Sequence, residues 1–158
     1  MPGNNSKKIY IASDHAGFEL KGKLIDYLEI EGYIIQDMGA HSYDEADDYP
    51  DFVSLVAREV SDSPVESLGV VIGGSGQGEA MVCNRFPNVR ASVYYGGNLD
   101  VVKTTRQHND SNVLSLGARF MSEEEAESAL KIWLETDFSG EERHIRRHKK
   151  IEELKNVK

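Results

Sequence analysis

Several features that mark particular classes of protein are scarce or missing in this chain. Its 158 residues include a single cysteine, Cys83, which excludes an internal disulfide and a zinc site built from cysteines, and which fits a reducing compartment. No apolar run approaches the roughly 18 residues that a membrane-spanning helix requires, and the opening MPGNNSKK is too short and too polar for a signal peptide. We therefore expect a soluble, cytoplasmic protein.

Positive charge is also scarce. The chain has 18 Lys and Arg residues against 27 Asp and Glu residues, a formal net charge of −9, so neither nucleic acid nor an anionic membrane is expected as a partner. One segment departs from this trend, because RHIRRHKK (143–150) carries five basic residues and no acidic one. A local positive cluster on an acidic chain suits a small anionic ligand better than a polyanion.

Short β-branched or apolar runs alternate with helical patterns along the chain, which is typical of βαβ units and a parallel sheet. The length and the 39% hydrophobic content fit one globular domain over residues 1–158. The expected helices are a leucine-rich one between the first two strands, one that begins at Pro50, one with a capping box at Ser122 and Glu125, and one over 141–156. The predicted strands are 8–13, 33–38, 68–74, 90–95 and 113–118.

Three polar clusters follow predicted strands. Asp14 and His15 come after the first strand, GGSGQGE (73–79) after the third, and Arg119 after the fifth. Ligands of open parallel sheets bind beyond the carboxyl ends of the strands, so we expect these clusters to form one site. The most irregular stretch, 39–48, is expected to cross the surface, and residues 1–7 are expected to be disordered.

The glycine-rich stretch between a strand and a helix suggests a phosphate cradle, but two known phosphate motifs fail here. Counted from Gly74 and Gly76, the third glycine of G-x-G-x-x-G falls on Glu79, and the same residue replaces the lysine of the P-loop. The remaining function of such a glycine-rich loop is an oxyanion hole, in which backbone N–H groups face a transient negative charge. The carboxylate of Glu79 would then act as a general base. That is the chemistry of an aldose–ketose isomerase.

Structural explanations of the same residues stay open at this stage. The glycines could make a tight turn that packs on the sheet, Glu79 could be an ordinary acid in the first turn of a helix, and Ser75 could be a plain helix cap. Tyr49 suits a sugar contact and packing equally well, and His108 could cap a helix end. The i, i+4 spacing of the histidines at 144 and 148 could also hold a metal.

Five ordered blocks resemble the type B ribose-5-phosphate isomerases, within the family that includes galactose-6-phosphate isomerases. The blocks are SDHAG, DYPDF, GGSGQGEAMVCNRFPNVRA, RQHNDSNVLSLGAR and RHIRR, and together they cover about residues 8 to 150. The resemblance implies an α/β fold, a three-layer α/β/α Rossmann-like sandwich with a five-stranded parallel sheet. It also implies a homodimer, or a tetramer, with active sites at the interface and the 141–156 helix reaching the partner subunit.

The resemblance further implies interconversion of D-ribose 5-phosphate and D-ribulose 5-phosphate through a cis-enediolate, without a metal or cofactor. Glu79 matches the proton acceptor, His108 the residue that opens the furanose ring, and Asp14 and Ser75 are expected to help move protons. Gly73 stands where the other branch of the family has a cysteine base, and Cys83 is expected to be a small buried hydrophobe. The expected substrate-binding residues are Asp14, His15, Tyr49, Gly74, Ser75, Gly76, Gln77, Gly78, Asn109, Arg119, Arg143 and Arg147.

Two kinds of rival function remain. The substrate could be a six-carbon or four-carbon sugar phosphate, since sequence alone does not measure the size of the pocket. Alternatively, the chain could be a phosphosugar sensor without catalysis or a flavodoxin-like signalling domain. The complete set of Glu79, His108 and the arginines argues against the sensor, and the glycines after the third strand argue against a receiver domain.

Overall fold

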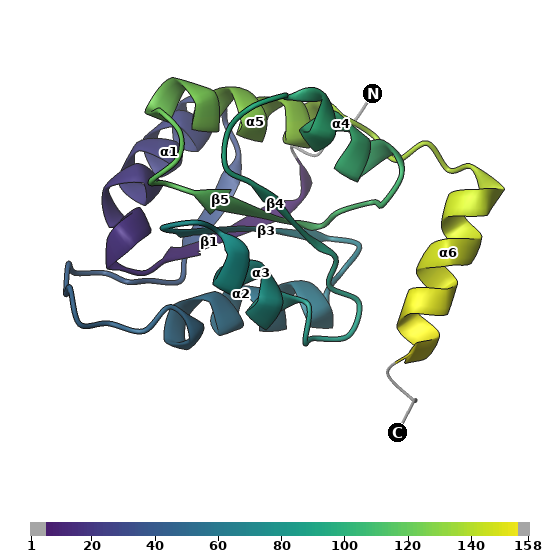
Figure 1. Cartoon of the computed structure of the whole chain (residues 1–158), viewed down its shortest axis with the longest axis horizontal. Coiled ribbons are helices and arrows are strands. Elements are labelled where there is room, and N and C mark those ends of the chain that lie inside the picture. Colours follow the sequence, from purple (N-terminus) through teal and green to yellow (C-terminus); the bar gives the residue numbers. More distant parts are fainter. Residues whose placement is uncertain (1–5, 155–158) are drawn as a thin grey trace.

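A five-stranded, fully parallel sheet forms the centre of the molecule, as a computed structural model that describes residues 6–154 shows (Figure 1). The strand order is β2-β1-β3-β5-β4. All five strands were predicted, within two residues at each end. They are β1 (Lys8–Ser13), β2 (Ile34–Asp37), β3 (Ser67–Gly73), β4 (Ala91–Tyr94) and β5 (Val113–Gly117).

Helices cover both faces of the sheet and make three layers, as expected. One face carries α1 (Phe18–Ile30), α4 (Asp100–Gln107) and α5 (Glu123–Glu135), and the other carries α2 (Pro50–Asp62) and α3 (Gln77–Cys83) (Figure 1). The central strand β3 is buried along its whole length, which explains its continuous apolar run, because a strand covered on both faces has no polar side. Each face has its own apolar cluster, one against Trp133 of α5 and one against Val56 of α2.

Local signals set the beginnings of two helices where the sequence predicted them. Pro50 occupies the first turn of α2, where its missing N–H leaves no hydrogen bond unmade. At the start of α5, the Ser122 hydroxyl accepts from the Glu125 N–H while the Glu125 carboxylate accepts from the Ser122 N–H. The predicted capping box is therefore present.

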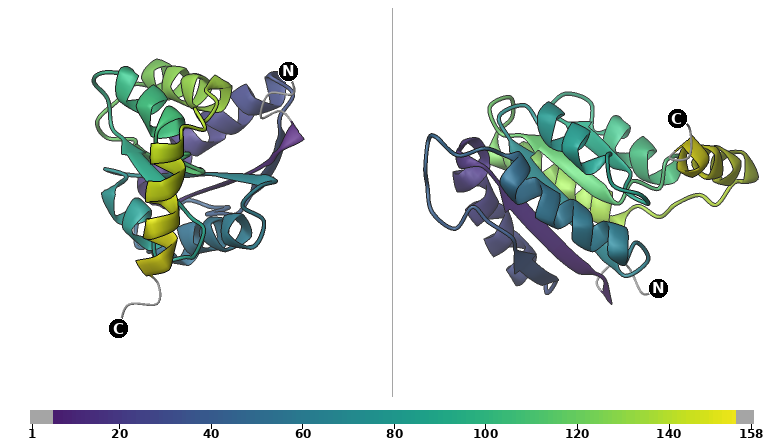
Figure 2. Two further views of the ribbon diagram at one scale, coloured as in Figure 1. Left: turned by 90° about the vertical axis from the view of Figure 1, so that its right-hand side faces the viewer. Right: turned by 90° about the horizontal axis from the view of Figure 1, so that it is seen from below.

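The C-terminal helix α6 (Glu142–Glu153) lies outside the three layers, beside the end of the molecule at which β5 begins (Figures 1 and 2). It was predicted over 141–156, and residues 155–158 lie outside the described part of the chain. Of residues 1–7, which we expected to be disordered, 1–5 also lie outside it, and Ser6 and Lys7 lead directly into β1. Between residues 6 and 154, no helix is long and apolar enough to cross a membrane.

The strand order places a topological switch point between β1 and β3. The two strands are paired from Lys8 with Ser67 to Ser13 with Ile72. After β1 the chain adds β2 on one side of this pair, and after β3 it adds β4 and β5 on the other side. Crevices form at such points, outside the carboxyl ends of the strands. The turn after β1 and the glycine loop after β3 both border this crevice.

Candidate active site

The three predicted clusters do converge at the carboxyl edge of the sheet. The Ala118 N–H donates to the Gly73 carbonyl at 2.8 Å, and the Arg119 N–H donates to the Gly74 carbonyl at 3.1 Å. A Cβ atom added to Gly74 would lie 3.1 Å from Nη1 of Arg119. The glycine loop and the segment after β5 are therefore in direct contact.

The glycine loop has a conformation that depends on its small residues. Gly76 precedes the first residue of α3 with φ of +77°, a left-handed conformation that side chains rarely adopt. Its carbonyl accepts a 2.6 Å hydrogen bond from the buried Ser115 hydroxyl. Ser75 is not the cap residue of α3, although its hydroxyl accepts from the Gln77 N–H at 3.3 Å. Tyr49 packs against this loop, since a Cβ added to Gly78 would lie 2.5 Å from its hydroxyl oxygen.

Glu79 lies in the first turn of α3 and is 3% exposed. Its Oε2 atom is buried without a hydrogen-bond partner among the described residues. Burial raises the pKa of this carboxyl group, and the nearby Asp14 carboxylate raises it further, while the backbone N–H groups of Glu79 and Gly76 partly offset both effects. A carboxylate with a raised pKa and an unsatisfied oxygen is suited to accept a proton from carbon near neutral pH.

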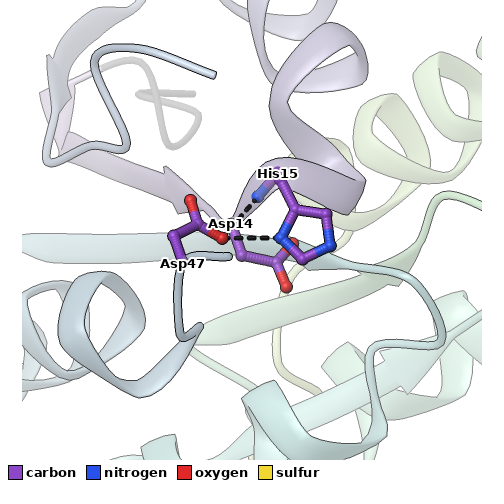
Figure 3. Close-up of side chains that lie close together, drawn as sticks. All are labelled: Asp14, His15 and Asp47. Carbon is purple, nitrogen blue, oxygen red and sulfur yellow. Dashed lines mark hydrogen bonds and ion pairs between the residues drawn. The ribbon is translucent and has the colours of Figure 1, made fainter. Parts of the chain in front are cut away.

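Asp14 and His15 form the turn that follows β1 (Figure 3). One oxygen of the buried Asp14 carboxylate accepts from the N–H groups of Ala16 and Gly17, at 2.9 and 3.3 Å, and so caps the short 3₁₀ helix His15–Gly17. The His15 ring donates from Nδ1 to Asp47 Oδ1 at 2.6 Å. This hydrogen bond is the main cause that raises the pKa of His15, with the Asp14 charge adding to it.

Asp14, His15 and Asp47 bring three possible metal-ligating atoms within 4.8 Å of one another. Protein contacts account for this arrangement, because Asp14 caps a helix and Nδ1 of His15 is bonded to Asp47. A raised pKa of His15 also works against metal binding, which requires neutral imidazole. We therefore assign no metal to this cluster.

The other predicted site residues lie at the opposite edge of the sheet. His108 is the C-cap residue of α4, as its position at a helix end suggested, and Asn109 follows it. Both residues come before β5, whereas Arg119 comes after it. Five residues of strand at ~3.3 Å each therefore separate His108 and Asn109 from Arg119 by roughly 16 Å. Arg143 and Arg147 of α6 lie on the His108 side, because the His108 ring stacks on His144 of that helix, with centroids 4.5 Å apart. One chain thus holds two separate groups of predicted site residues, which we call half-sites.

Comparisons with known proteins agree with both the fold and the motifs. A family model described as Ribose/Galactose Isomerase matches residues 9–151. The chain belongs to the ribose/galactose isomerase family. It is 38% identical over 141 residues to ribose-5-phosphate isomerase B of Mycolicibacterium paratuberculosis, covering 89% of this chain and 86% of the relative.

Solved structures of this family superpose closely on the chain. Ribose-5-phosphate isomerase B from Mycoplasma genitalium, crystallised with bound ribulose-5-phosphate, matches with a TM-score of 0.92 and 35% identity, covering 97% of this chain and 99% of that one. The Clostridium thermocellum enzyme matches with a TM-score of 0.87 and 38% identity, covering 94% and 97%. The three-layer fold with its parallel sheet is therefore that of the family.

Within the family, the structure explains why this chain has glycine at position 73. A Cβ atom there would overlap the Glu79 carboxylate, so a cysteine at position 73 and Glu79 in its present place exclude each other. Cys83 lies one turn beyond Glu79 and is fully buried. Burial and the Glu79 charge raise the pKa of its thiol to about 12, which makes it the inert residue that we expected.

Two residues with a place in the half-sites were missed by the sequence analysis. Asp47, from the irregular 39–48 loop, fixes His15, and Ser115, inside β5, holds the glycine loop. His144, which the sequence analysis considered as a metal ligand, stacks on His108. The roles of Asp47 and Ser115 do not show in local spacing. Only the acidic residue before DYPDF gave a signal, and it looked like surface charge.

Proposed function

We propose that the chain is an aldose–ketose isomerase that interconverts D-ribose 5-phosphate and D-ribulose 5-phosphate through a cis-enediolate. The observation that carries this proposal is Glu79, a buried carboxylate beside a glycine loop at a helix N-terminus, with one oxygen that no residue of the described chain bonds. The names of the relatives support the same substrate pair.

Proton transfer is the step that Glu79 supports. It takes the proton from carbon 2 of the open-chain aldose and returns it to carbon 1. The negative charge that develops on the oxygens of the enediolate is stabilised by backbone N–H groups of residues 74–78, which need no reorganisation during the reaction. Ser75 and Asp14, at the same edge, help to move hydroxyl protons. Our proposed chemistry uses no metal and no organic cofactor.

Binding and ring opening use the second half-site. His108 moves the proton that opens the furanose ring, and Asn109 contacts the sugar. Arg143 and Arg147 bind the phosphate, and Arg119 reaches it from the first half-site. Two arginines at i, i+4 can grip one phosphate through charge-assisted hydrogen bonds. His144 is held neutral beside them, since burial, His108 and Arg143 lower its pKa.

The separation of the half-sites supports a homodimer in which each active site takes Glu79 from one chain and His108 from the other. A two-fold axis would join two such composite sites in one dimer, because each contact in a two-fold interface occurs twice. The position of α6 outside the three layers suits a helix that reaches the partner subunit. A cytoplasmic location and a further association to tetramers stay predictions.

A comparison of substrates tests the proposed reaction. The purified chain is assayed side by side on ribose 5-phosphate, allose 6-phosphate, galactose 6-phosphate and erythrose 4-phosphate. We expect the highest kcat/KM on ribose 5-phosphate. A higher kcat/KM on a six-carbon or four-carbon substrate would replace the substrate but keep the chemistry, and no turnover of any of the four would contradict the proposed reaction.

A further inference from the structure

Asp47 binds both the backbone and the ring of His15 through one carboxylate oxygen. Its Oδ1 atom accepts both the His15 backbone N–H at 3.0 Å and the ring Nδ1–H at 2.6 Å. Its side chain is only 8% exposed, against 24% for His15. Figure 3 shows the Asp47 carboxylate facing the backbone nitrogen and the ring Nδ1 of His15. Because both ends of His15 are held, the ring has one orientation and Nδ1 carries a proton, so Nε2 can donate only when the ring is protonated on both nitrogens.

Protein contacts hold the loop that carries Asp47 at its start and in the turn directly before Asp47. At its start, the buried Lys21 donates to Asp37 Oδ1 at 2.8 Å and to the Ala40 carbonyl at 2.5 Å. Nearer Asp47, its own N–H donates to the Asp44 carbonyl at 3.1 Å. A partner that is held in advance loses little entropy when it orients a ligand-binding group.

From the contact between Asp47 and His15, we propose that Asp47 is a positioning residue, which turns Nε2 of His15 toward the sugar phosphate so that it donates to the anionic phosphate group. Nε2 lies on the side of the ring opposite to Nδ1 and therefore faces away from Asp47. The inference rests on the proposed function, and it adds Asp47 to the residues that the sequence motifs indicate.

The charges around His15 agree with such a role. The hydrogen bond to Asp47 and the charges of Asp14 and Asp47 raise the pKa of the ring, while burial and the charge of Arg119, on the segment after β5, lower it. Tyr43 packs edge-on against the ring, with centroids 6.4 Å apart. With Asp47 in place, His15 keeps its second proton to higher pH, and this doubly protonated ring is the form whose Nε2–H makes a charge-assisted bond to phosphate.

The test compares Asp47→Asn with Glu45→Gln, which removes the same charge from an exposed residue of the same loop. The pKa of His15 is followed through the NMR signal of its ring Cε1–H, and KM and kcat are measured on ribose 5-phosphate. We expect Asp47→Asn to lower the pKa of His15 and to raise KM about tenfold, the scale of one charge-assisted hydrogen bond, with kcat changed less than about threefold. Glu45→Gln is expected to leave all three values near those of the wild type.

A double-mutant cycle with His15→Gln shows whether Asp47 acts through His15. In that background, Asp47→Asn is expected to add less than about a twofold rise in KM. A full tenfold rise there, or an unchanged pKa of His15 in Asp47→Asn, overturns the inference. The NMR titration needs no turnover, so a wild-type chain that is inactive on sugar phosphates contradicts the proposed function separately, while the contact between Asp47 and His15 is still measured.

Discussion

Replacing Glu79 with glutamine is expected to change activity and stability in opposite directions. Glutamine keeps the shape of the side chain but cannot accept the proton, so kcat is expected to fall by about 10²–10⁴-fold, the usual contribution of a general base. The buried carboxylate has an oxygen without a partner between residues 6 and 154, and a group of that kind costs roughly 1–3 kcal/mol of stability. Because the amide is also polar, we expect a net gain near the lower limit, about 1 kcal/mol, or ~2–4 °C in Tm for a chain of this size.

The sign of the pH dependence makes this prediction specific. Since the pKa of Glu79 is raised in the folded state, folding favours its protonated form. The stability that the protonated Glu79 contributes is fully present below the pKa that Glu79 has in the unfolded chain. It is lost as the pH rises through the raised pKa that Glu79 has in the folded protein. The Tm advantage of Glu79→Gln over the wild type is therefore expected to be small at pH 4 and to grow toward pH 8. Wild-type kcat/KM is expected to fall as the pH drops through the same raised pKa.

The assays are thermal denaturation and isomerisation kinetics over that pH range. Glu124→Gln provides the matched control, because Glu124 occupies the first turn of α5 as Glu79 does that of α3, but is exposed. The control is expected to keep full activity and a Tm within about 2 °C of the wild type. Near-normal turnover by Glu79→Gln, or a Tm at pH 8 below that of the wild type, would refute the assignment of Glu79 as a buried base.

Three further predictions concern the same sites. Gly73→Ala places a Cβ atom on the Glu79 carboxylate and is expected to lower kcat about 10²-fold, the cost of a ~1 Å shift of a catalytic group; unchanged kinetics would mean that Glu79 is not the base. Iodoacetamide is expected to leave activity intact at pH 7.5, because the pKa of the Cys83 thiol is about 12, and progressive inactivation would contradict this. Arg143→Ala is expected to raise KM for ribose 5-phosphate about tenfold and more than the exposed Arg146→Ala on the same helix, whereas an equal loss on unphosphorylated ribose would exclude a phosphate contact.

The sheet was predictable because its pattern is local. Buried strands such as β3 show as continuous apolar runs, and β1 agrees with its predicted bounds at both ends. The edge strand β2 is shorter than predicted, Ile34–Asp37 rather than 33–38, since it pairs with β1 alone and only over those four residues. Where tertiary pairing decides a boundary, periodicity cannot set it.

The first half-site was predictable for a similar reason, and its supporting residues were not. Strand ends place Glu79 and His15 at one edge whatever the details of packing. The hydrogen bond that the His15 ring donates to Asp47 joins residues 32 positions apart. The loop that carries Asp47 has no repeating pattern that could have indicated it. Likewise, nothing local shows that His144 will stack on His108, because that contact depends on the direction in which α6 leaves the sheet.

The most direct test of the proposal that two chains share each active site is complementation between two inactive variants. Glu79→Gln and His108→Asn chains with different affinity tags are expressed together, and the mixed dimer is isolated through both tags. If each site takes Glu79 from one chain and His108 from the other, one of the two sites in this dimer is intact, and its kcat per dimer is expected to be about half that of the wild type. Activity of the mixed dimer no higher than that of the two inactive parents would contradict a site built from two chains.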